Sequence, residues 1–137
     1  MKKILYLTIC FIFLWHNLKS AEKPELVFVE GGNLKLGNKT FVISSFEITK
    51  YEVTNNDYAV FLNASKIGKD GIFNNRLIIN TTSPDLQIEY KNNRWTGMEG
   101  RENRPMVMVN YFGASEYCKW AGGKLPDLAE WTWAAMG

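Results

Sequence analysis

The sequence predicts an α+β domain, with strands concentrated at the start and helices spaced along the rest. Short runs rich in β-branched and aromatic residues fill positions 25–49, which favours strands. Thr54 and Asp127 are of the type that caps helices, and each precedes an apolar stripe with helical spacing. The segment 65–103 between them is polar and rich in Gly and Asn. With 137 residues, of which 46% are hydrophobic, the chain is long enough for one core.

The opening segment is expected to be β-structure. Glu25–Val29 and Asn33–Leu36 flank Glu30-Gly31-Gly32, a pattern that predicts a hairpin. Lys39–Ser44 is rich in β-branched residues and predicts a further strand.

The first helix is expected to begin after Thr54 and to run to about Ala64. Thr54 is placed as the N-cap with Asp57 as the third helical residue, and Val53 and Tyr58 are spaced as a hydrophobic staple. In the polar segment that follows we expect long loops and one hairpin, which turns at Asn92-Asn93.

The last third of the chain predicts a strand and two helices. Pro105 introduces the apolar run Met106–Val109, which predicts a buried strand. A helical stripe that includes Tyr117 and Cys118 then ends at Gly122-Gly123, and Asp127 with Glu130 forms an acidic capping box for the next helix. The apolar stripe of that helix consists of Leu128, Trp131, Ala134 and Ala135.

Residues 1–20 predict a secretory signal peptide, and residues 21–137 the mature domain. Lys2 and Lys3 precede an apolar run from Ile4 to Trp15, which is too short for a membrane-spanning helix. A lipoprotein signal at Cys10 is disfavoured, because the bulky Ile9 stands where a small residue is needed. We therefore expect export to the periplasm or the cell exterior, from a bacterial source, with no membrane span after cleavage.

Cleavage would also remove His16, the one histidine of the chain, together with Cys10. The remaining residues could form neither an imidazole metal site nor a Ser-His-Asp triad by themselves. Three of the 16 Lys and Arg residues would be lost, which leaves the chain close to neutral against 14 Asp and Glu residues. A clustered basic excess is absent from the sequence, and so no nucleic-acid partner is expected.

The chain resembles the formylglycine-generating enzyme family, also called the sulfatase-modifying-factor family. In the second half the resemblance rests on Pro105, Val107, Val109, Ala114, Tyr117, Cys118, Trp120, Gly122, Leu125, Pro126, Ala129, Glu130, Trp131, Ala134, Ala135 and Gly137. In the first half it rests on the segments 28–32, 36–37 and 46–55, which include Glu52, Thr54 and Asn55, followed by Tyr58 and Phe61. Gly113 stands where the family has Asp, and we expect this change to remove a helix-capping acceptor.

The resemblance implies a fold similar to C-type lectins. We expect only the N-terminal part of that fold here, truncated after its second to third helix. It also implies oxidation of a sulfatase cysteine to formylglycine, with copper bound by two cysteines, and calcium as a further candidate ion. Those cysteines belong to the C-terminal half of the family domain. This chain is therefore expected to hold no catalytic, cofactor or metal residue. We interpret the matching positions as a structural motif, which consists of Glu52, Thr54, Asn55, Pro105, Tyr117, Cys118, Trp120, Leu125, Pro126, Glu130 and Trp131.

Some of these residues have an alternative role. Cys118 could be a reactive thiol, but on an apolar helix face a buried residue or a disulfide partner is favoured. Trp120, Trp131 and Trp133 could line a groove, although core packing is more common at helical spacing. For Glu52 a structural hydrogen bond is favoured over catalysis. Few strands remain for the terminal helices to contact, so Trp131, Trp133 and Met136 would be partly exposed in the isolated chain.

Three hypotheses about function remain open at this point. The chain could be the front part of a sulfatase-maturing oxidoreductase, whose partner would be a sulfatase or another exported protein or peptide. It could instead be a non-catalytic, lectin-like binding or assembly module, or an inactive truncated relic.

Overall fold

The computed structural model describes residues 24–137, so the predicted signal peptide lies outside the described residues. The elements are β1 (Leu26–Val29), β2 (Gly32–Leu36), β3 (Lys39–Ile43), β4 (Phe46–Thr49), α1 (Asn55–Ala64), β5 (Ile72–Phe73), β6 (Arg76–Leu77), β7 (Ile88–Lys91), β8 (Arg94–Gly97), α2 (Tyr111–Trp120) and α3 (Leu128–Met136). The predicted mixture of helices and antiparallel strands is confirmed. Between residues 24 and 137, every helix is too short or too polar to cross a membrane.

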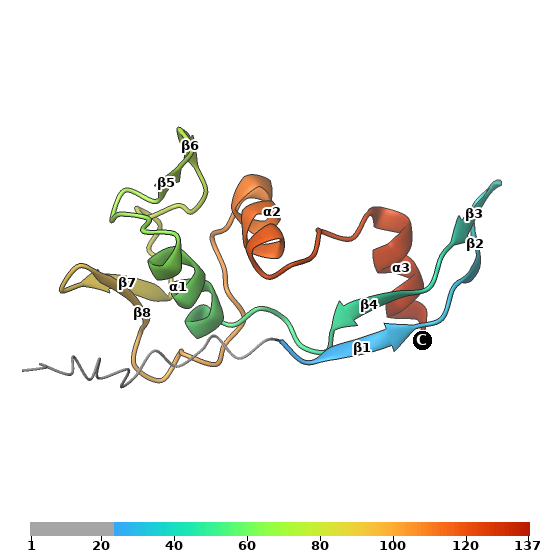
Figure 1. Ribbon diagram of the computed structural model, residues 1–137, viewed down its shortest axis with the longest axis horizontal. Coiled ribbons are helices and arrows are strands. Elements are labelled where there is room, and N and C mark those ends of the chain that lie inside the picture. Colours follow the sequence, from blue (N-terminus) through green and yellow to red (C-terminus); the bar gives the residue numbers. More distant parts are fainter. Residues whose placement is uncertain (1–23) are drawn as a thin grey trace, which may run out of the picture.

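The elements form two groups along an elongated molecule (Figure 1). At one end, α1, α2 and β5–β8 form what we call the core lobe. At the other end lie β1–β4, which we call the arm, and α3. The main cluster of buried side chains lies entirely in the core lobe and consists of Tyr58, Ala59, Phe61, Leu62, Ile67, Ile78, Ile79, Leu86, Ile88, Trp95 and Tyr117.

The arm is one long hairpin interrupted in the middle. β1 pairs with β4 and β2 pairs with β3, and both ladders keep the same register, from Leu26 opposite Thr49 to Leu36 opposite Lys39. The chain turns at Gly37, whose φ of +58° suits the first central position of a tight hairpin turn. The strand predicted over Lys39–Ser44 is therefore confirmed as β3.

The hairpin predicted at Glu30-Gly31-Gly32 is wrong, because β1 and β2 follow one another along the same side of the arm. The glycines here permit close packing. A Cβ atom on Gly31 would lie 2.7 Å from the backbone nitrogen of Ser45, and one on Gly32 would lie 2.5 Å from Cζ2 of Trp133.

The core lobe is organised around α1, which contacts β7, β8 and α2. Its predicted start is confirmed, because Thr54 and Asp57 form a capping box. The predicted hairpin at Asn92-Asn93 is also confirmed, with φ angles of 50° and 58° at the two residues. A second Asn-Asn pair, Asn74-Asn75, makes the same kind of turn between β5 and β6, which was not predicted.

The strand predicted over Met106–Val109 is wrong. Pro105 and Val109 make only isolated bridges, to Thr54 and Ile79 respectively. Between them Met108 has a φ of +63°, which turns the backbone away from an extended ladder. The segment is therefore an irregular connection, although Met106, Met108 and Val109 still pack against the core.

α2 forms as predicted and is followed by Gly122 at a φ of +90°. Gly113 has no side chain that could accept a hydrogen bond, and α2 is capped instead by Asn110, whose Oδ1 accepts a hydrogen bond from the Gly113 nitrogen at 3.0 Å. Gly113 is needed for close packing. A Cβ atom there would collide with the carbonyl oxygen of Ile78 and lie 2.6 Å from the hydroxyl of Tyr58.

α3 begins with the predicted capping box of Asp127 and Glu130. The expectation of a core position for Trp131 is wrong, because 58% of its surface is exposed. The partial exposure expected for the isolated chain holds for Trp131 and Met136. Only Trp133 is anchored, through a hydrogen bond from Nε1 to the Glu30 carbonyl oxygen at 2.7 Å.

Candidate functional site

A groove of about 620 Å³ lies where the arm meets the core lobe. Four segments contribute to it: the start of β1, the connection from β4 to α1, the loop before Pro105, and one residue of α2. The lining residues are Pro24, Glu25, Thr49, Tyr51, Glu52, Val53, Thr54, Asp57, Asn103, Pro105 and Tyr117.

Tyr117 provides the rigid part of the groove. Only 6% of its surface is exposed, and its ring stacks on Tyr58 with centroids 5.7 Å apart. Burial, assisted by the negative charge of Asp57, raises the pKa of Tyr117 to about 12. Its hydroxyl therefore keeps its proton at physiological pH and can act as a hydrogen-bond donor.

The carboxylate of Asp57 is held in place by the capping box. It accepts a hydrogen bond from the Thr54 nitrogen at 3.1 Å and from the Thr54 hydroxyl at 2.5 Å. Asp57 is thus fixed in the first turn of α1, where the helix dipole favours a negative charge.

The loop before Pro105 is held against the start of α1 by backbone carbonyl groups. The Asn55 nitrogen donates to the Arg104 oxygen at 2.9 Å, and the Asn56 nitrogen donates to the Glu102 oxygen at 3.0 Å. The side chain of Asn55, which is fully buried, donates through Nδ2 to the Arg101 oxygen at 2.7 Å. These bonds place Asn103 and Pro105 at the groove.

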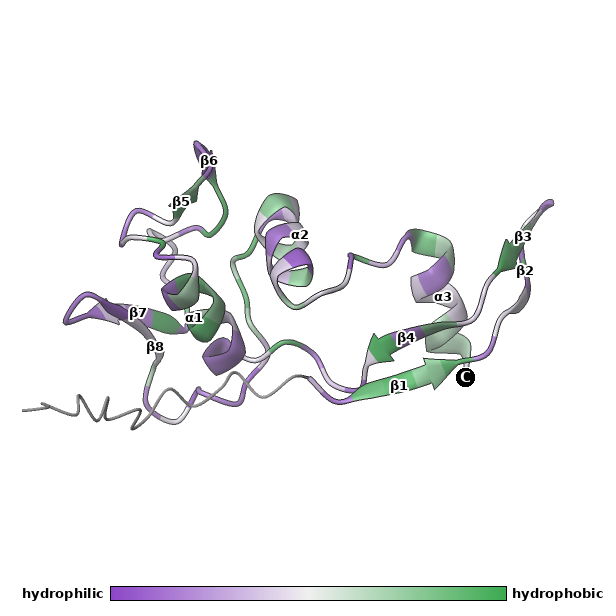
Figure 2. Cartoon of the chain, in the orientation of Figure 1, coloured by the Kyte–Doolittle hydropathy of each residue, from purple (hydrophilic) through white to green (hydrophobic). Residues whose placement is uncertain are grey.

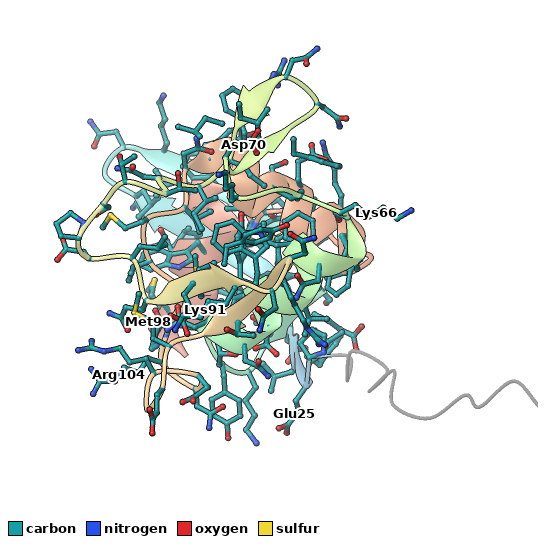
Figure 3. All side chains as sticks on the ribbon, turned by 90° about the vertical axis from the view of Figure 1, so that its left-hand side faces the viewer. Glu25, Lys66, Asp70, Lys91, Met98 and Arg104 are labelled. Carbon is teal, nitrogen blue, oxygen red and sulfur yellow. The ribbon has the colours of Figure 1, made fainter. Side chains whose placement is uncertain are left out.

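The groove is acidic, because Glu25, Glu52 and Asp57 line it and none of the described residues in its lining is cationic. Lys50 only partly offsets this charge, through an ion pair with Glu25 at 2.8 Å. Arg104, a neighbour of two lining residues in sequence, is not part of the lining, and Figure 3 shows its side chain pointing outward, on the same lower edge as Glu25.

The structure brings only part of the predicted motif together. Glu52, Thr54, Pro105 and Tyr117 line the groove, and Asn55 lies buried behind it. Glu52 is exposed, and the cap of α1 is made without it.

The other motif residues lie elsewhere. Trp120 packs on Phe61 and Tyr117, with 38% of its surface exposed. Leu125 and Pro126 are half-buried in the turn before α3. Glu130 caps α3 and also binds Lys124 at 2.7 Å.

Seven lining residues lie outside the predicted motif, and the polar side chains of Glu25, Tyr51 and Asp57 are among them. Tyr51 directly precedes the matched Glu52, which is the sequence signal that could have singled it out, and in the structure its side chain is 67% exposed. Glu25 carries no sequence signal, because it reaches the groove only through the pairing of β1 with β4.

The described residues do not fit a copper site of two thiolates. Cys118 is the free thiol within residues 24–137, and it is half-buried on α2 against the core. Burial raises the pKa of its thiol, which disfavours the thiolate that Cu(I) requires. Within residues 24–137 no cluster of three or more His, Cys, Asp or Glu side chains could hold a metal ion.

Comparison with known proteins identifies the family. Residues 15–137 match the sulfatase-modifying factor enzyme 1-like domain (FGE-sulfatase). The chain therefore belongs to this family, as its sequence motifs indicated.

The relatives carry two different names. The formylglycine-generating enzyme from Mus musculus is 29% identical over 69% of this chain and 32% of the enzyme. The formylglycine-generating enzyme from Streptomyces coelicolor is also 29% identical, over 72% of this chain and 38% of the enzyme. The serine/threonine-protein kinase pkn1 of Chlamydia caviae is 28% identical over 82% of this chain and 19% of the kinase. The chain thus spans about a fifth to two fifths of these three relatives.

Proposed function

We propose that this chain is the peptide-recognition part of an exported sulfatase-modifying-factor domain, and that its groove binds an arginine or lysine side chain of another exported protein. The observation that carries this proposal is the groove of Glu25, Glu52 and Asp57, to whose lining residues 24–137 contribute no cationic side chain.

The chemistry of the lining favours a long basic side chain. Carboxylates at Glu25, Glu52 and Asp57 would attract the charged head, while Val53 and Pro105 offer apolar surface to its aliphatic stem. Tyr51 adds an exposed aromatic ring, which already lies 5.4 Å from the Lys50 ammonium group. The Tyr117 hydroxyl remains a donor for a backbone carbonyl of the same ligand.

Recognition rather than oxidation is the role supported by the described residues. The single half-buried thiol of Cys118 cannot supply the thiolate pair that copper would need. Formylglycine formation by the whole protein would therefore need thiols from outside residues 24–137. Relatives named as protein kinases also contain this kind of segment, so membership of the family does not by itself imply formylglycine formation.

The proposal includes the expected location and fold. A protein partner in the periplasm or outside the cell would agree with the signal peptide predicted at residues 1–20. The lectin-like architecture implied by the sequence resemblance agrees with a binding role, and the mixed α+β elements are compatible with it.

The test is to titrate the chain that begins at residue 21 with the peptide Gly-Ala-Arg-Ala-Gly and to monitor binding by changes in NMR chemical shifts. Exposed ion pairs are weak, so we expect a dissociation constant on the order of 1 mM. Saturable shifts should appear at Tyr51, Glu52 and Tyr117. Glu52→Gln should weaken binding by roughly threefold to tenfold, because it removes one attractive charge.

Two controls define the outcome. Glu89→Gln removes a carboxylate of β7 that pairs with Lys91 outside the groove, and it should leave the affinity unchanged. A peptide with Gln in place of Arg should bind more weakly. Equal binding of the two peptides, or equal affinity of the Glu52→Gln variant, would show that the groove does not read a basic side chain.

A further inference from the structure

A second pocket, of about 330 Å³, lies beside β7 and β8 on the core lobe. Its walls come from three parts of the chain: the segment 84–87 just before β7, Met98 directly after β8, and the connection from β8 to α2 at Arg101 and 107–108. Figure 2 shows that this connection is hydrophilic where it leaves β8 and hydrophobic where it approaches α2. The volume is at the lower end for ligand pockets, which favours a small ligand.

The pocket contains two opposite charges that do not pair. Asp85 and Arg101 both line it. Among residues 24–137, neither side chain forms an ion pair with the other or with a third residue. Both side chains are exposed, so water satisfies them in the chain alone. A ligand that carries a carboxylate and a cation of its own could pair with both at once.

The rest of the lining is mainly apolar and is held in place by backbone hydrogen bonds. The Met98 nitrogen donates to the Gln87 oxygen at 3.0 Å, and the Arg101 nitrogen donates to the Met98 oxygen at 2.9 Å. Nδ2 of the buried Asn55 donates to the Arg101 oxygen at 2.7 Å. The walls are therefore formed before a ligand arrives, which lowers the cost of binding. The apolar lining residues are Pro84, Leu86, Met98, Val107 and Met108.

The composition of the lining distinguishes between possible ligands. Asp85 would repel a purely anionic ligand such as phosphate, and Arg101 would repel a cation. A divalent metal ion needs several oxygen ligands, whereas the described lining offers one carboxylate and the amide of Gln87. A wholly apolar ligand would remove water from both charges without replacing it. A small ligand with both charges and an apolar portion meets every requirement.

We infer that this pocket binds a free apolar α-amino acid in its zwitterionic form. The guanidinium of Arg101 pairs with the α-carboxylate, for which its forked donors are well suited. The carboxylate of Asp85 pairs with the ammonium group, which is attached to the same α-carbon of the ligand. Met98 and Met108 contact the aliphatic side chain of the ligand, because flexible thioether side chains adapt to different apolar shapes.

This inference goes beyond the proposed function and rests on other residues. Among residues 24–137, the acidic groove and this pocket share no lining residue. Binding of the arginine peptide and binding of an amino acid can therefore succeed or fail separately.

The test is to titrate the chain that begins at residue 21 with L-leucine and to monitor the methyl signals by NMR. We expect saturable shifts at Leu86, Met98 and Met108, with a dissociation constant on the order of 1 mM, because exposed ion pairs are weak. Two analogues separate the charges of the ligand. L-leucinamide lacks the carboxylate and N-acetyl-L-leucine lacks the ammonium group, and each should bind at least about fivefold more weakly.

Matched variants identify the two charges of the pocket. Arg101→Gln and Asp85→Asn should each weaken the binding of L-leucine by at least about fivefold. Arg104→Gln is the control for the first variant, because the Arg104 side chain is outside the lining and points outward (Figure 3). Asp70→Asn is the control for the second variant, because Figure 3 shows Asp70 far above Met98 on the core lobe. Both controls should keep the affinity of the unaltered chain.

The outcomes are distinct. Saturable binding that needs both charges and persists in both controls supports the inference. Failure to observe saturable shifts at about 20 mM L-leucine overturns it. Equal binding of N-acetyl-L-leucine also overturns it, because the pocket would then recognise a carboxylate alone, such as the C-terminus of a polypeptide.

Discussion

The indole nitrogen of Trp133 and the carbonyl oxygen of Glu30 are joined by a hydrogen bond of 2.7 Å across 103 positions of sequence. This bond and the contact of the Trp133 ring with Gly32 attach α3 to the arm. The last helix is therefore stabilised by the first strands rather than by the core lobe.

Replacement of Trp133 by Phe should loosen this attachment. The ring keeps part of its packing, but the Glu30 carbonyl oxygen loses its donor, which costs about 1 kcal/mol. Hydrogen exchange of α3 should become faster, by about fivefold for that energy. Trp131→Phe is the matched control, because Trp131 is exposed and should leave the exchange of α3 unchanged. An equal effect of the two substitutions would contradict the assigned anchor.

Gly113→Ala should destabilise the core lobe strongly. The new methyl group would press against the Ile78 carbonyl and the Tyr58 hydroxyl at the start of α2. Overpacking of this kind costs about 1 to 3 kcal/mol of the free energy of unfolding, which urea denaturation would measure. Gly123→Ala is the control, because the nearest atom to its Cβ, the Cys118 oxygen, is 3.8 Å away. Similar losses in both variants would argue against the close packing at Gly113.

Tyr58→Phe should leave the chain as stable as before or slightly more so. The Tyr58 hydroxyl is buried with no hydrogen-bond partner in the described structure, and burial raises its pKa. Removal of an unsatisfied buried hydroxyl can stabilise a protein by about 1 kcal/mol, provided that the ring packing remains. Urea denaturation would measure this change, and a loss above about 1 kcal/mol would indicate a partner for the hydroxyl.

The stability of the first turn of α3 should depend on pH, because Glu130 titrates there. Its hydrogen bond with Lys124, and then its bond with the Asp127 backbone, lower the pKa of Glu130 below the ordinary value of 4.5. A carboxyl group whose pKa is lower in the folded state stabilises that state above its ordinary pKa, and the contribution is lost as the pH falls through the folded pKa. Exchange of the α3 amides should therefore increase, relative to intrinsic rates, below about pH 4.5. In Glu130→Gln this dependence should be absent.

Cys118 should react slowly with a thiol reagent such as Ellman's reagent at neutral pH. Burial raises the pKa of its thiol, and the thiolate is the reactive form. We expect the rate to be at least about tenfold below that of the urea-unfolded chain. Equal rates in the two states would show that the thiol is accessible.

Local sequence signals predicted the three helices and one of the three hairpin turns. Thr54 with Asp57, and Asp127 with Glu130, cap helices as expected, because each cap involves residues only three positions apart. The Asn92-Asn93 turn was equally local.

Features that depend on distant contacts were not predictable in the same way. Two glycines at Gly31-Gly32 predicted a turn, but they are required by the close approach of Ser45 and Trp133, which no local pattern reveals. The groove was missed for the same reason, since it joins Glu25 to Tyr117 across most of the described chain.

The loop that holds the start of α1 has a consequence for evolution. Its acceptors are the backbone carbonyls of Arg101, Glu102 and Arg104, which every amino acid possesses. These hydrogen bonds would therefore be kept after substitution at any of the three positions. Selection would act instead on Asn55, the one side chain that joins in this contact, and on Pro105, which shapes the exit of the loop.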